Sequence, residues 1–267
     1  MPYANLTSDV GAAINAYKLL WNYPEKYKNI IIHLGDFHFL KEGFAILGKL
    51  VTASGFEDII FQSGICSTGS LNGVIAGSHY NRCWSIHGIL SESLERLLFE
   101  RFITNHQVKS KKLKKIFKYK EITDDMPNTL STLPEVIEIA IKFEAFKDEV
   151  RAGKHGRTAQ FWLIYYLDFM MNQHLLHNAI QTNNFSLRLC DLKEMMPFTF
   201  ALDKQNYARY ESYYIHSLEN LDITHPSCRE RLQDKGLSVQ AQERYPCRTA
   251  IDQRGETINR DEKQVVA

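Results

Sequence analysis

The pattern of apolar positions predicts a small α/β segment near the start of the chain. Residues 10–21 (VGAAINAYKLLW) carry apolar side chains at roughly helical spacing and contain no proline, which predicts a helix. Residues 29–34 (NIIIHL) contain three consecutive isoleucines, and such β-branched side chains favour a strand. Because this stretch is apolar on both faces, we expect a central strand that is covered on both sides.

The segment that follows is expected to continue the α/β pattern. A helix is predicted over residues 41–53, where Ser54 and Gly55 provide a stop signal. Residues 57–62 (EDIIFQ) predict a short second strand. The small residues 67–70 (STGS) predict a loop or a helix cap, because they lack the lysine of a phosphate-binding loop.

Long helical patterns dominate the chain from about residue 65. They cover residues 84–102, 133–150, 158–181 and 185–196. The third is apolar almost all round, so we expect it to be buried among other helices. Pro197 is expected to end the fourth, and a short strand at 237–240 precedes a polar helix at 250–265. The order is therefore a small α/β start, a large helical middle and a short helical tail.

Composition excludes several broad classes of protein. The chain has 267 residues, of which 44% are hydrophobic and 24% are charged, so it is neither disordered nor collagen-like. Its 32 Lys and Arg residues nearly balance 31 Asp and Glu residues, and the formal charge of +1 gives no overall attraction to nucleic acid or membranes. No apolar run approaches the ~20 residues of a membrane-spanning helix, so we expect no membrane partner.

The amino-terminal residues and the cysteines predict an intracellular protein. The first residues show no basic segment followed by an apolar run, so we do not expect secretion. The five cysteines are scattered and form no Cys-x-x-Cys pair, which argues against a zinc knuckle or a disulfide framework. Nucleus and cytoplasm both stay open.

Asp9 is the first candidate for chemistry. It stands between a predicted strand end and the start of the helix at 10–21, where a carboxylate can hold a metal ion in the crevice at the strand ends. The same position suits a helix N-cap, whose side chain accepts backbone N–H groups. Position alone favours the cap.

Asp36 and His38 directly follow the predicted strand at 29–34. Their side chains point the same way if the strand continues through them, and together they could bind a divalent ion or position a phosphate. The alternative is a polar strand end whose histidine is hydrogen-bonded in the core.

Glu256 is the third acidic candidate. Asp252, Glu256 and Asn259 are spaced so that they share one face of the predicted terminal helix, which can offer a carboxylate to a metal ion. The alternative is a solvated face on which Glu256 pairs with Arg260.

Two further features have weaker patterns. His174 and His177 are spaced as helical metal ligands, but their apolar surroundings favour core packing. Seven lysines lie within residues 109–120 (KSKKLKKIFKYK), and such a run either neutralises DNA phosphates or forms a solvated segment. The lysines assigned to nucleic-acid binding are Lys109, Lys111, Lys112, Lys114 and Lys115.

Several blocks, taken in order, resemble a group of transposable-element-derived proteins. They are LTSDVGAAINAY, NIIIHLGDFHFL, SGFEDIIFQSGICSTGSLNGVIAGSHYNR, FALDKQNYARY and TAIDQRGETINR. More distantly, the layout resembles the RNase H-like transposases of the hAT and P-element kind. The resemblance implies an α/β, mostly helical fold, in which a large all-helical insertion interrupts a partial RNase H-like core. The implied parts are core residues 1–64, insertion residues 65–245 and a helix at 246–267 that returns to the core.

The resemblance also implies a set of site residues. Asp9 matches the second catalytic aspartate and Glu256 the catalytic glutamate, and both are expected to bind Mg²⁺ together with Asp36. The supporting positions are His38, Asp203, Asn206, Tyr207 and Arg209. The implied reaction is phosphodiester hydrolysis and strand transfer with two Mg²⁺ ions. DNA is the implied partner, and a homo-oligomer is compatible with it.

One part of the family pattern is missing from this sequence. The family fold opens with a three-stranded hairpin that carries the first catalytic aspartate, and only eight residues precede Asp9. We therefore expect a truncated or inactive remnant, with Mg²⁺ as cofactor only if it is active. The alternatives are a non-catalytic nucleic-acid-binding remnant that uses the lysine run and a helical protein-interaction remnant.

Overall fold

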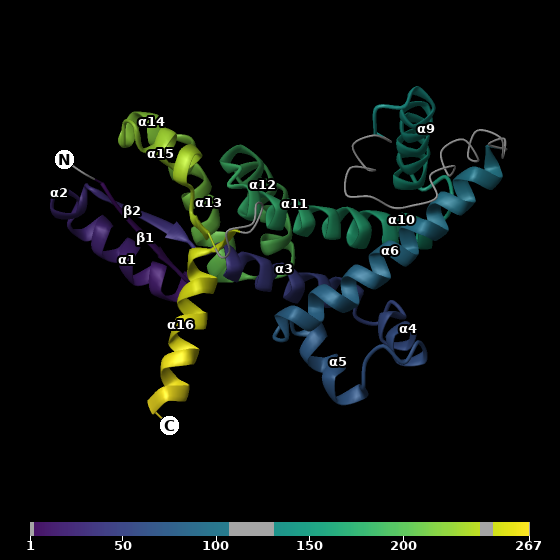
Figure 1. Ribbon diagram of the computed structural model, residues 1–267, viewed down its shortest axis with the longest axis horizontal. Coiled ribbons are helices and arrows are strands. Elements are labelled where there is room, and N and C mark those ends of the chain that lie inside the picture. Colours follow the sequence, from purple (N-terminus) through teal and green to yellow (C-terminus); the bar gives the residue numbers. More distant parts are fainter. Residues whose placement is uncertain (1–2, 107–130, 241–247, 267) are drawn as a thin grey trace. The chain divides into compact units, whose positions relative to one another are not determined.

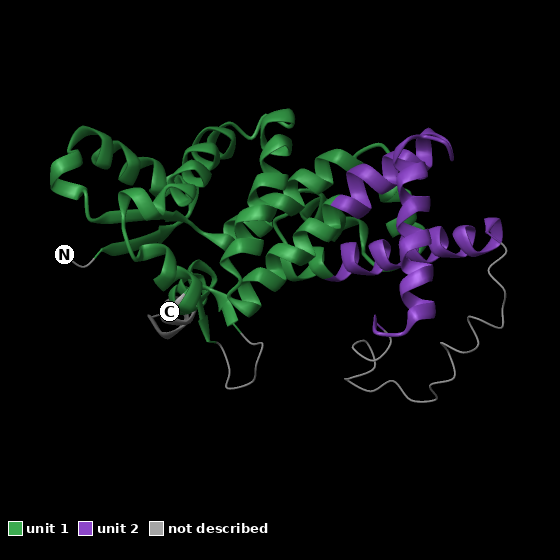
Figure 2. Ribbon diagram, turned by 90° about the horizontal axis from the view of Figure 1, so that it is seen from above, with its two compact units in different colours: residues 1–84, 169–267 green, residues 85–168 purple. Residues whose placement is uncertain are grey.

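The chain folds into two compact units. The computed structural model describes residues 3–106, 131–240 and 248–266. The first unit consists of Met1–Trp84 with Phe169–Ala267, and the second is Ser85–Asp168 (Figure 2). The second unit covers fewer residues than the predicted insertion at 65–245. The carboxy-terminal helix belongs to the same unit as the amino-terminal segment. The lysine run at 109–120 lies outside the described residues.

The first unit begins with two paired parallel strands that are connected in sequence by two helices (Figure 1). The elements are β1 (Ala4–Ser8), α1 (Val10–Asn22), α2 (Pro24–Tyr27) and β2 (Ile30–Leu34). Parallel pairing needs a crossover connection, which α1 and α2 provide. The strands pair in register from Ala4 opposite Ile30 to Ser8 opposite Leu34, so both end at the same edge. The helix and the strand expected here are confirmed, and most of β2 is buried, as its apolar sequence predicts.

The helix predicted at 41–53 is present but begins earlier, and a predicted strand after it is helical. Helix α3 (Asp36–Val51) begins one residue after β2, so the strand does not continue through Asp36 and His38. The predicted second strand at 57–62 is wrong, because these residues form α4 (Phe56–Gln62). Phe56 and Ile60, four positions apart, are buried and fix the helical period.

Helices and a small antiparallel sheet complete the first unit. They are α5 (Thr68–Ile75), α12 (Phe185–Ala201), α13 (Gln205–Glu219), α14 (Leu221–Thr224), α15 (Cys228–Lys235), β3 (Ser238–Gln240), β4 (Arg248–Ala250) and α16 (Ile251–Val266). Helix α16 packs against α3 and β1. Pro197 lies inside α12 rather than at its end. The last turn is held by packing, because Thr199 is buried and Phe198 contacts Phe169 with ring centroids 4.9 Å apart.

The second unit is a helical cluster around aromatic side chains. Helix α6 (Tyr80–Asn105) leads into it, followed by α9 (Pro134–Arg151), α10 (Arg157–Trp162) and the π-helical turn η1 (Leu163–Leu167). Its core contains Phe102, Ile139, Phe146, Val150 and Leu163. The helix predicted over 158–181 is thus interrupted by η1 before it continues as α11 (Asp168–Thr182). Among the described helices, none is both long and apolar enough to cross a bilayer.

Candidate functional site at the strand ends

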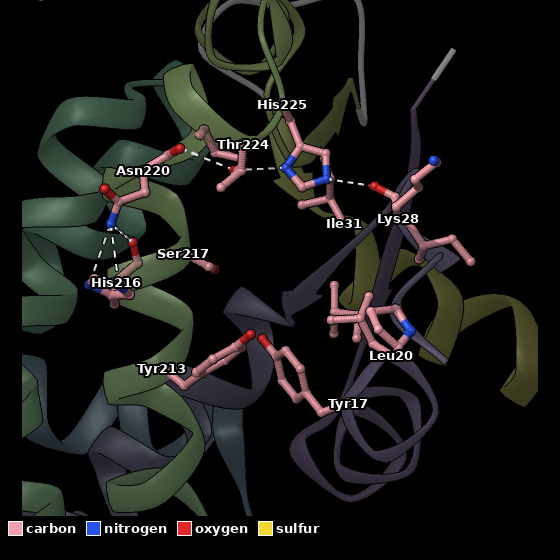
Figure 3. Close-up of a pocket in the computed structure, with 14 residues that line it drawn as sticks. Tyr17, Leu20, Lys28, Ile31, Tyr213, His216, Ser217, Asn220, Thr224 and His225 are labelled. Carbon is pink, nitrogen blue, oxygen red and sulfur yellow. Dashed lines mark hydrogen bonds between the residues drawn. The ribbon is translucent and has the colours of Figure 1, made fainter. Parts of the chain in front are cut away.

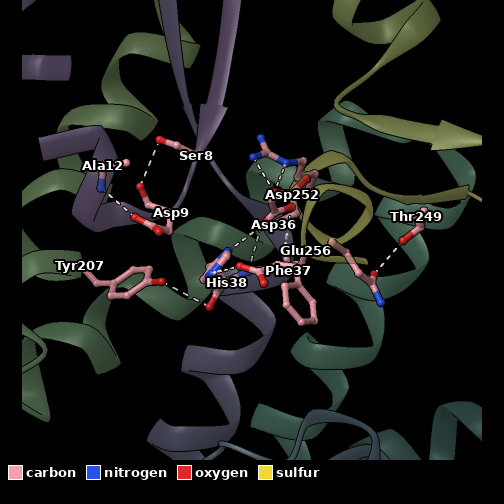
Figure 4. Close-up of polar contacts among 12 residues, drawn as sticks. Ser8, Asp9, Ala12, Asp36, Phe37, His38, Tyr207, Thr249, Asp252 and Glu256 are labelled. Atoms are coloured by element: carbon pink, nitrogen blue, oxygen red, sulfur yellow. Dashed lines mark hydrogen bonds and ion pairs between the residues drawn. The ribbon is translucent and has the colours of Figure 1, made fainter. Parts of the chain in front are cut away.

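Asp9 follows β1 and caps helix α1 (Figure 4). Its Oδ1 atom accepts a hydrogen bond from the Ala12 N–H at 2.7 Å. This satisfies one of the backbone donors that a helix leaves unpaired at its start. The cap that the sequence position favours is therefore present, and the Asp9 side chain is at the surface beside the strand ends.

Asp36 is committed to an ion pair in the interior. Its Oδ1 atom lies 2.6 Å from both Nε and Nη2 of Arg188, on helix α12. The two side chains are only 4% and 5% exposed. Burial raises the pKa of Asp36, and the Arg188 guanidinium acts in the opposite direction. This carboxylate is occupied by a protein cation, which does not fit the predicted role of metal ligand.

The ion pair continues into a chain of buried hydrogen bonds. Arg188 donates from Nη2 to the Tyr214 hydroxyl oxygen at 2.8 Å. The Tyr214 hydroxyl then donates its proton to Nδ1 of His33 at 3.1 Å, so His33 carries its own proton on Nε2 and donates it to Oδ1 of Asn5 at 2.9 Å. Burial lowers the pKa of His33 to about 3, which keeps the ring neutral. The network joins both strands to α12 and α13.

His38 and Asp252 meet at the start of α3. Asp252, on α16, accepts the backbone N–H groups of Phe37 and His38 at 3.3 and 3.2 Å and lies 2.9 Å from Nδ1 of His38. It thereby provides the cap that the sequence of α3 itself lacks. Gly35 is required by this approach, because a Cβ atom there would lie 2.2 Å from an Asp252 carboxylate oxygen.

Glu256 lies one turn beyond Asp252 on the same helix. Its Oε1 atom is 4.0 Å from Nε2 of His38, and 58% of its side chain is exposed. His38 therefore holds Asp252 with one ring nitrogen and faces Glu256 with the other (Figure 4). The predicted alignment of Asp252 and Glu256 on one helical face is confirmed.

Of the four supporting positions on or before α13, Tyr207 reaches this region. Its hydroxyl donates to the His38 carbonyl oxygen at 3.3 Å, and its ring packs on Phe39. Asp203, Asn206 and Arg209 are exposed, and Asp203 adopts a positive φ of 56° after the end of α12.

Glu211, one turn after Tyr207, is a buried acid that the sequence pattern does not single out. The Thr199 hydroxyl donates to the Met196 carbonyl oxygen at 2.7 Å and to Oε2 of Glu211 at 3.2 Å. Burial raises the pKa of Glu211 to about 8; the hydrogen bond from Thr199 acts in the opposite direction, and the nearby Glu42 acts in the same direction as burial. Burial therefore favours the neutral acid.

Glu211→Gln is expected to flatten the decline of stability at high pH. A folded-state pKa raised above the unfolded value gives stability that is complete below about pH 4.5 and lost as the pH rises through about 8. Glutamine keeps an oxygen that accepts the hydrogen bond from Thr199, and it does not titrate. The gain at pH 9 should be a few kcal/mol, since one pKa unit corresponds to about 1.4 kcal/mol. Urea unfolding at pH 5, 7 and 9 measures it, and parallel pH profiles of both proteins would contradict the assignment.

Two of the three predicted magnesium ligands already have protein partners in this structure. Mg²⁺ takes oxygen ligands in a nearly octahedral arrangement. Asp9 caps α1, and Asp36 pairs with Arg188. Of the three predicted ligands, Glu256 has the weakest contact, at 4.0 Å from Nε2 of His38. Within the described part of the chain, no group of three His, Cys, Asp or Glu side chains is arranged to hold a metal ion.

The histidine pair on α11 packs against an aromatic ring without being fully buried, since His174 is exposed and His177 half-buried. Both imidazoles contact Trp84, with ring centroids 5.2 and 5.0 Å from the indole. Burial lowers the pKa of both imidazoles.

Sequence reasoning did not single out Arg188 or Tyr214, and it placed Asp252 beside Glu256 without its contact to α3. All three residues come from helices far along the chain, and no local spacing connects them to the strand ends. His33 gave a usable signal, because a histidine within an apolar strand must find hydrogen-bond partners when it is buried.

The comparisons with known proteins give one match. A search of curated proteins and a search of solved structures each returned no match. A family model described as a domain of unknown function (DUF8702) matches residues 2–265. Since this match covers nearly the whole sequence, the chain belongs to the DUF8702 family.

Proposed function

We propose that this is a transposase-derived nucleic-acid-binding protein whose acidic strand ends hold the fold together instead of binding Mg²⁺. The observation that carries the proposal is that three aspartates in this region already have protein partners. Asp9 caps α1, Asp36 neutralises Arg188, and Asp252 caps α3. Carboxylates that already satisfy protein donors would have to give up those bonds to coordinate an ion.

Descent from a strand-transfer enzyme is supported by the order of the elements. A carboxylate follows each of the two parallel strands at their common edge, and a helix from the far end of the sequence returns to β1 and α3 with two more. The blocks that resemble transposable-element-derived proteins include the segments that hold these carboxylates.

Nucleic-acid binding is supported by the clustering of charge. The whole chain has a formal charge of +1, yet residues 109–120 contain seven lysines and no acidic residue. Lysines that neutralise phosphates release counterions, so the affinity falls steeply with salt. This segment supplies a local positive charge that the rest of the chain does not.

The test combines a binding assay and a cleavage assay on the full chain. We expect duplex DNA to bind with a strong salt dependence, and MgCl₂ to produce no nicking. Changing Lys109, Lys111, Lys112, Lys114 and Lys115 to Gln should reduce the slope of log K against log salt by about 4. The control changes five exposed lysines elsewhere to Gln and should leave most of the slope of log K against log salt unchanged. These lysines are Lys18, Lys49, Lys142, Lys154 and Lys193.

Two outcomes would contradict the proposal. Mg²⁺-dependent nicking that disappears in both Asp9→Asn and Glu256→Gln would show that the strand ends are a catalytic centre. DNA binding that is absent at low salt, or that is unchanged in the five-lysine variant, would remove the nucleic-acid role.

A further inference from the structure

A cavity of about 550 Å³ lies in the first unit, on one side of β2 (Figure 3). Its walls come from α1, β2, α13 and α14. This volume is in the range of sites that enclose small organic ligands, typically about 300–1,000 Å³. None of the residues assigned to the strand-end region lines it, so it is a separate feature of the molecule.

The walls of the cavity combine apolar surface with a few polar groups. Ile30, Ile31 and Ile32 of β2 line it together with Leu20 and Leu221. Such a surface favours a compact hydrophobic or aromatic body, because contact removes apolar area from water on both sides.

The ionisable groups around the cavity are basic or phenolic. Lys28, His216 and His225 line it, and the described residues contribute no carboxylate to the lining; Glu25, outside the lining, pairs with the Lys28 ammonium at 3.2 Å at the exposed rim. His225 is held in place by Thr224 at 2.8 Å and by the Lys28 carbonyl at 3.2 Å. This distribution favours a ligand with a negative charge over one with a positive charge.

Tyr17 provides an unused hydrogen-bonding group at the cavity wall. Its side chain is 2% exposed, and its hydroxyl has no hydrogen-bond partner among the described residues. In Figure 3 this hydroxyl points toward that of Tyr213 at one end of the cavity. Burial raises the pKa of Tyr17, so the hydroxyl keeps its proton and is available as a donor. A buried donor without an acceptor costs free energy, which a ligand oxygen would recover.

We propose that this cavity is a binding site for a compact aromatic carboxylate. The aromatic body packs against the isoleucines of β2, and one carboxylate oxygen accepts a hydrogen bond from Tyr17. The basic side chains at the wall supply the charge complement. Nothing in the strand-end region takes part in this binding, so the proposal is independent of the function proposed above.

The test is calorimetric titration of the full chain with 2-naphthoate. We expect saturable binding with one site, and about tenfold weaker binding to Tyr17→Phe, because hydrogen bonds to charged groups are worth about 1.5–3 kcal/mol. Tyr210→Phe is the matched control, since that ring stacks on Tyr17 at 5.7 Å but does not line the cavity. Leu20→Trp, which fills the cavity from a partly exposed position, should abolish binding.

Three outcomes would overturn the proposal. They are the absence of saturable binding, equal affinity of Tyr17→Phe and the unaltered protein, and equal affinity for the cation 2-naphthylmethylammonium. If Leu20→Trp fails to fold by circular dichroism, the comparison of Tyr17→Phe with Tyr210→Phe decides alone.

Discussion

Replacing Arg188 with leucine is expected to lower the free energy of unfolding of the first unit by about 3–5 kcal/mol. The substitution leaves the Asp36 carboxylate without its cation in a place where the side chain is only 4% exposed. It also removes the hydrogen bond that Nη2 of Arg188 donates to the Tyr214 hydroxyl oxygen at 2.8 Å. Urea unfolding followed by circular dichroism measures the loss.

A double-mutant cycle separates the ion pair from simple loss of packing. Asp36→Leu combined with Arg188→Leu removes both charges, and the double variant should be more stable than Arg188→Leu alone. An Arg188→Leu variant that loses less than about 1 kcal/mol would show that the pair is not buried as described.

Gly48→Ala is expected to destabilise the first unit by about 3 kcal/mol, at the upper end of the usual cost of overpacking. A Cβ atom at Gly48, on α3, would lie 1.9 Å from the Ile75 carbonyl oxygen at the end of α5. That oxygen belongs to the backbone, so it cannot move aside as the tip of a flexible side chain can. The two helices would have to separate, and thermal unfolding should report a lower midpoint.

Gly69→Ala is the matched control for the contact between α3 and α5. Gly69 lies in α5, and a Cβ atom there meets nothing within 4 Å. The change should be neutral or stabilise by up to about 1 kcal/mol, because alanine favours helix more than glycine does. Equal destabilisation by both substitutions would contradict the close contact at Gly48.

The elements that the sequence predicted correctly depend on local patterns. The helix after Asp9, the strand at 29–34 and the terminal helix at 250–265 each follow from the spacing and type of residues within one segment. The cap at Asp9 is equally local, since donor and acceptor are three positions apart. Such features need no information from elsewhere in the chain.

The errors arise where distant contacts decide the local structure. Residues 57–62 contain only three successive apolar residues, and periodicity alone does not separate a strand from a helix at that length. The start of α3 at Asp36 depends on a carboxylate 214 positions away from His38, which no window of sequence contains. Arg188, which forms an ion pair with Asp36, is 152 positions away along the chain. Its effect on the predicted metal site could therefore not be foreseen from the local sequence.

The cap that Asp252 provides has a consequence for the order in which the protein matures. During synthesis, α3 leaves the ribosome long before residue 252 is made, so its first turn has unpaired backbone donors throughout that interval. Contacts between such distant positions also close late in folding, because the chain must first lose the entropy of a long loop. The amino-terminal α/β segment therefore reaches its final structure only after translation has passed Asp252, and a ribosome that stalls earlier would present it uncapped to chaperones and proteases.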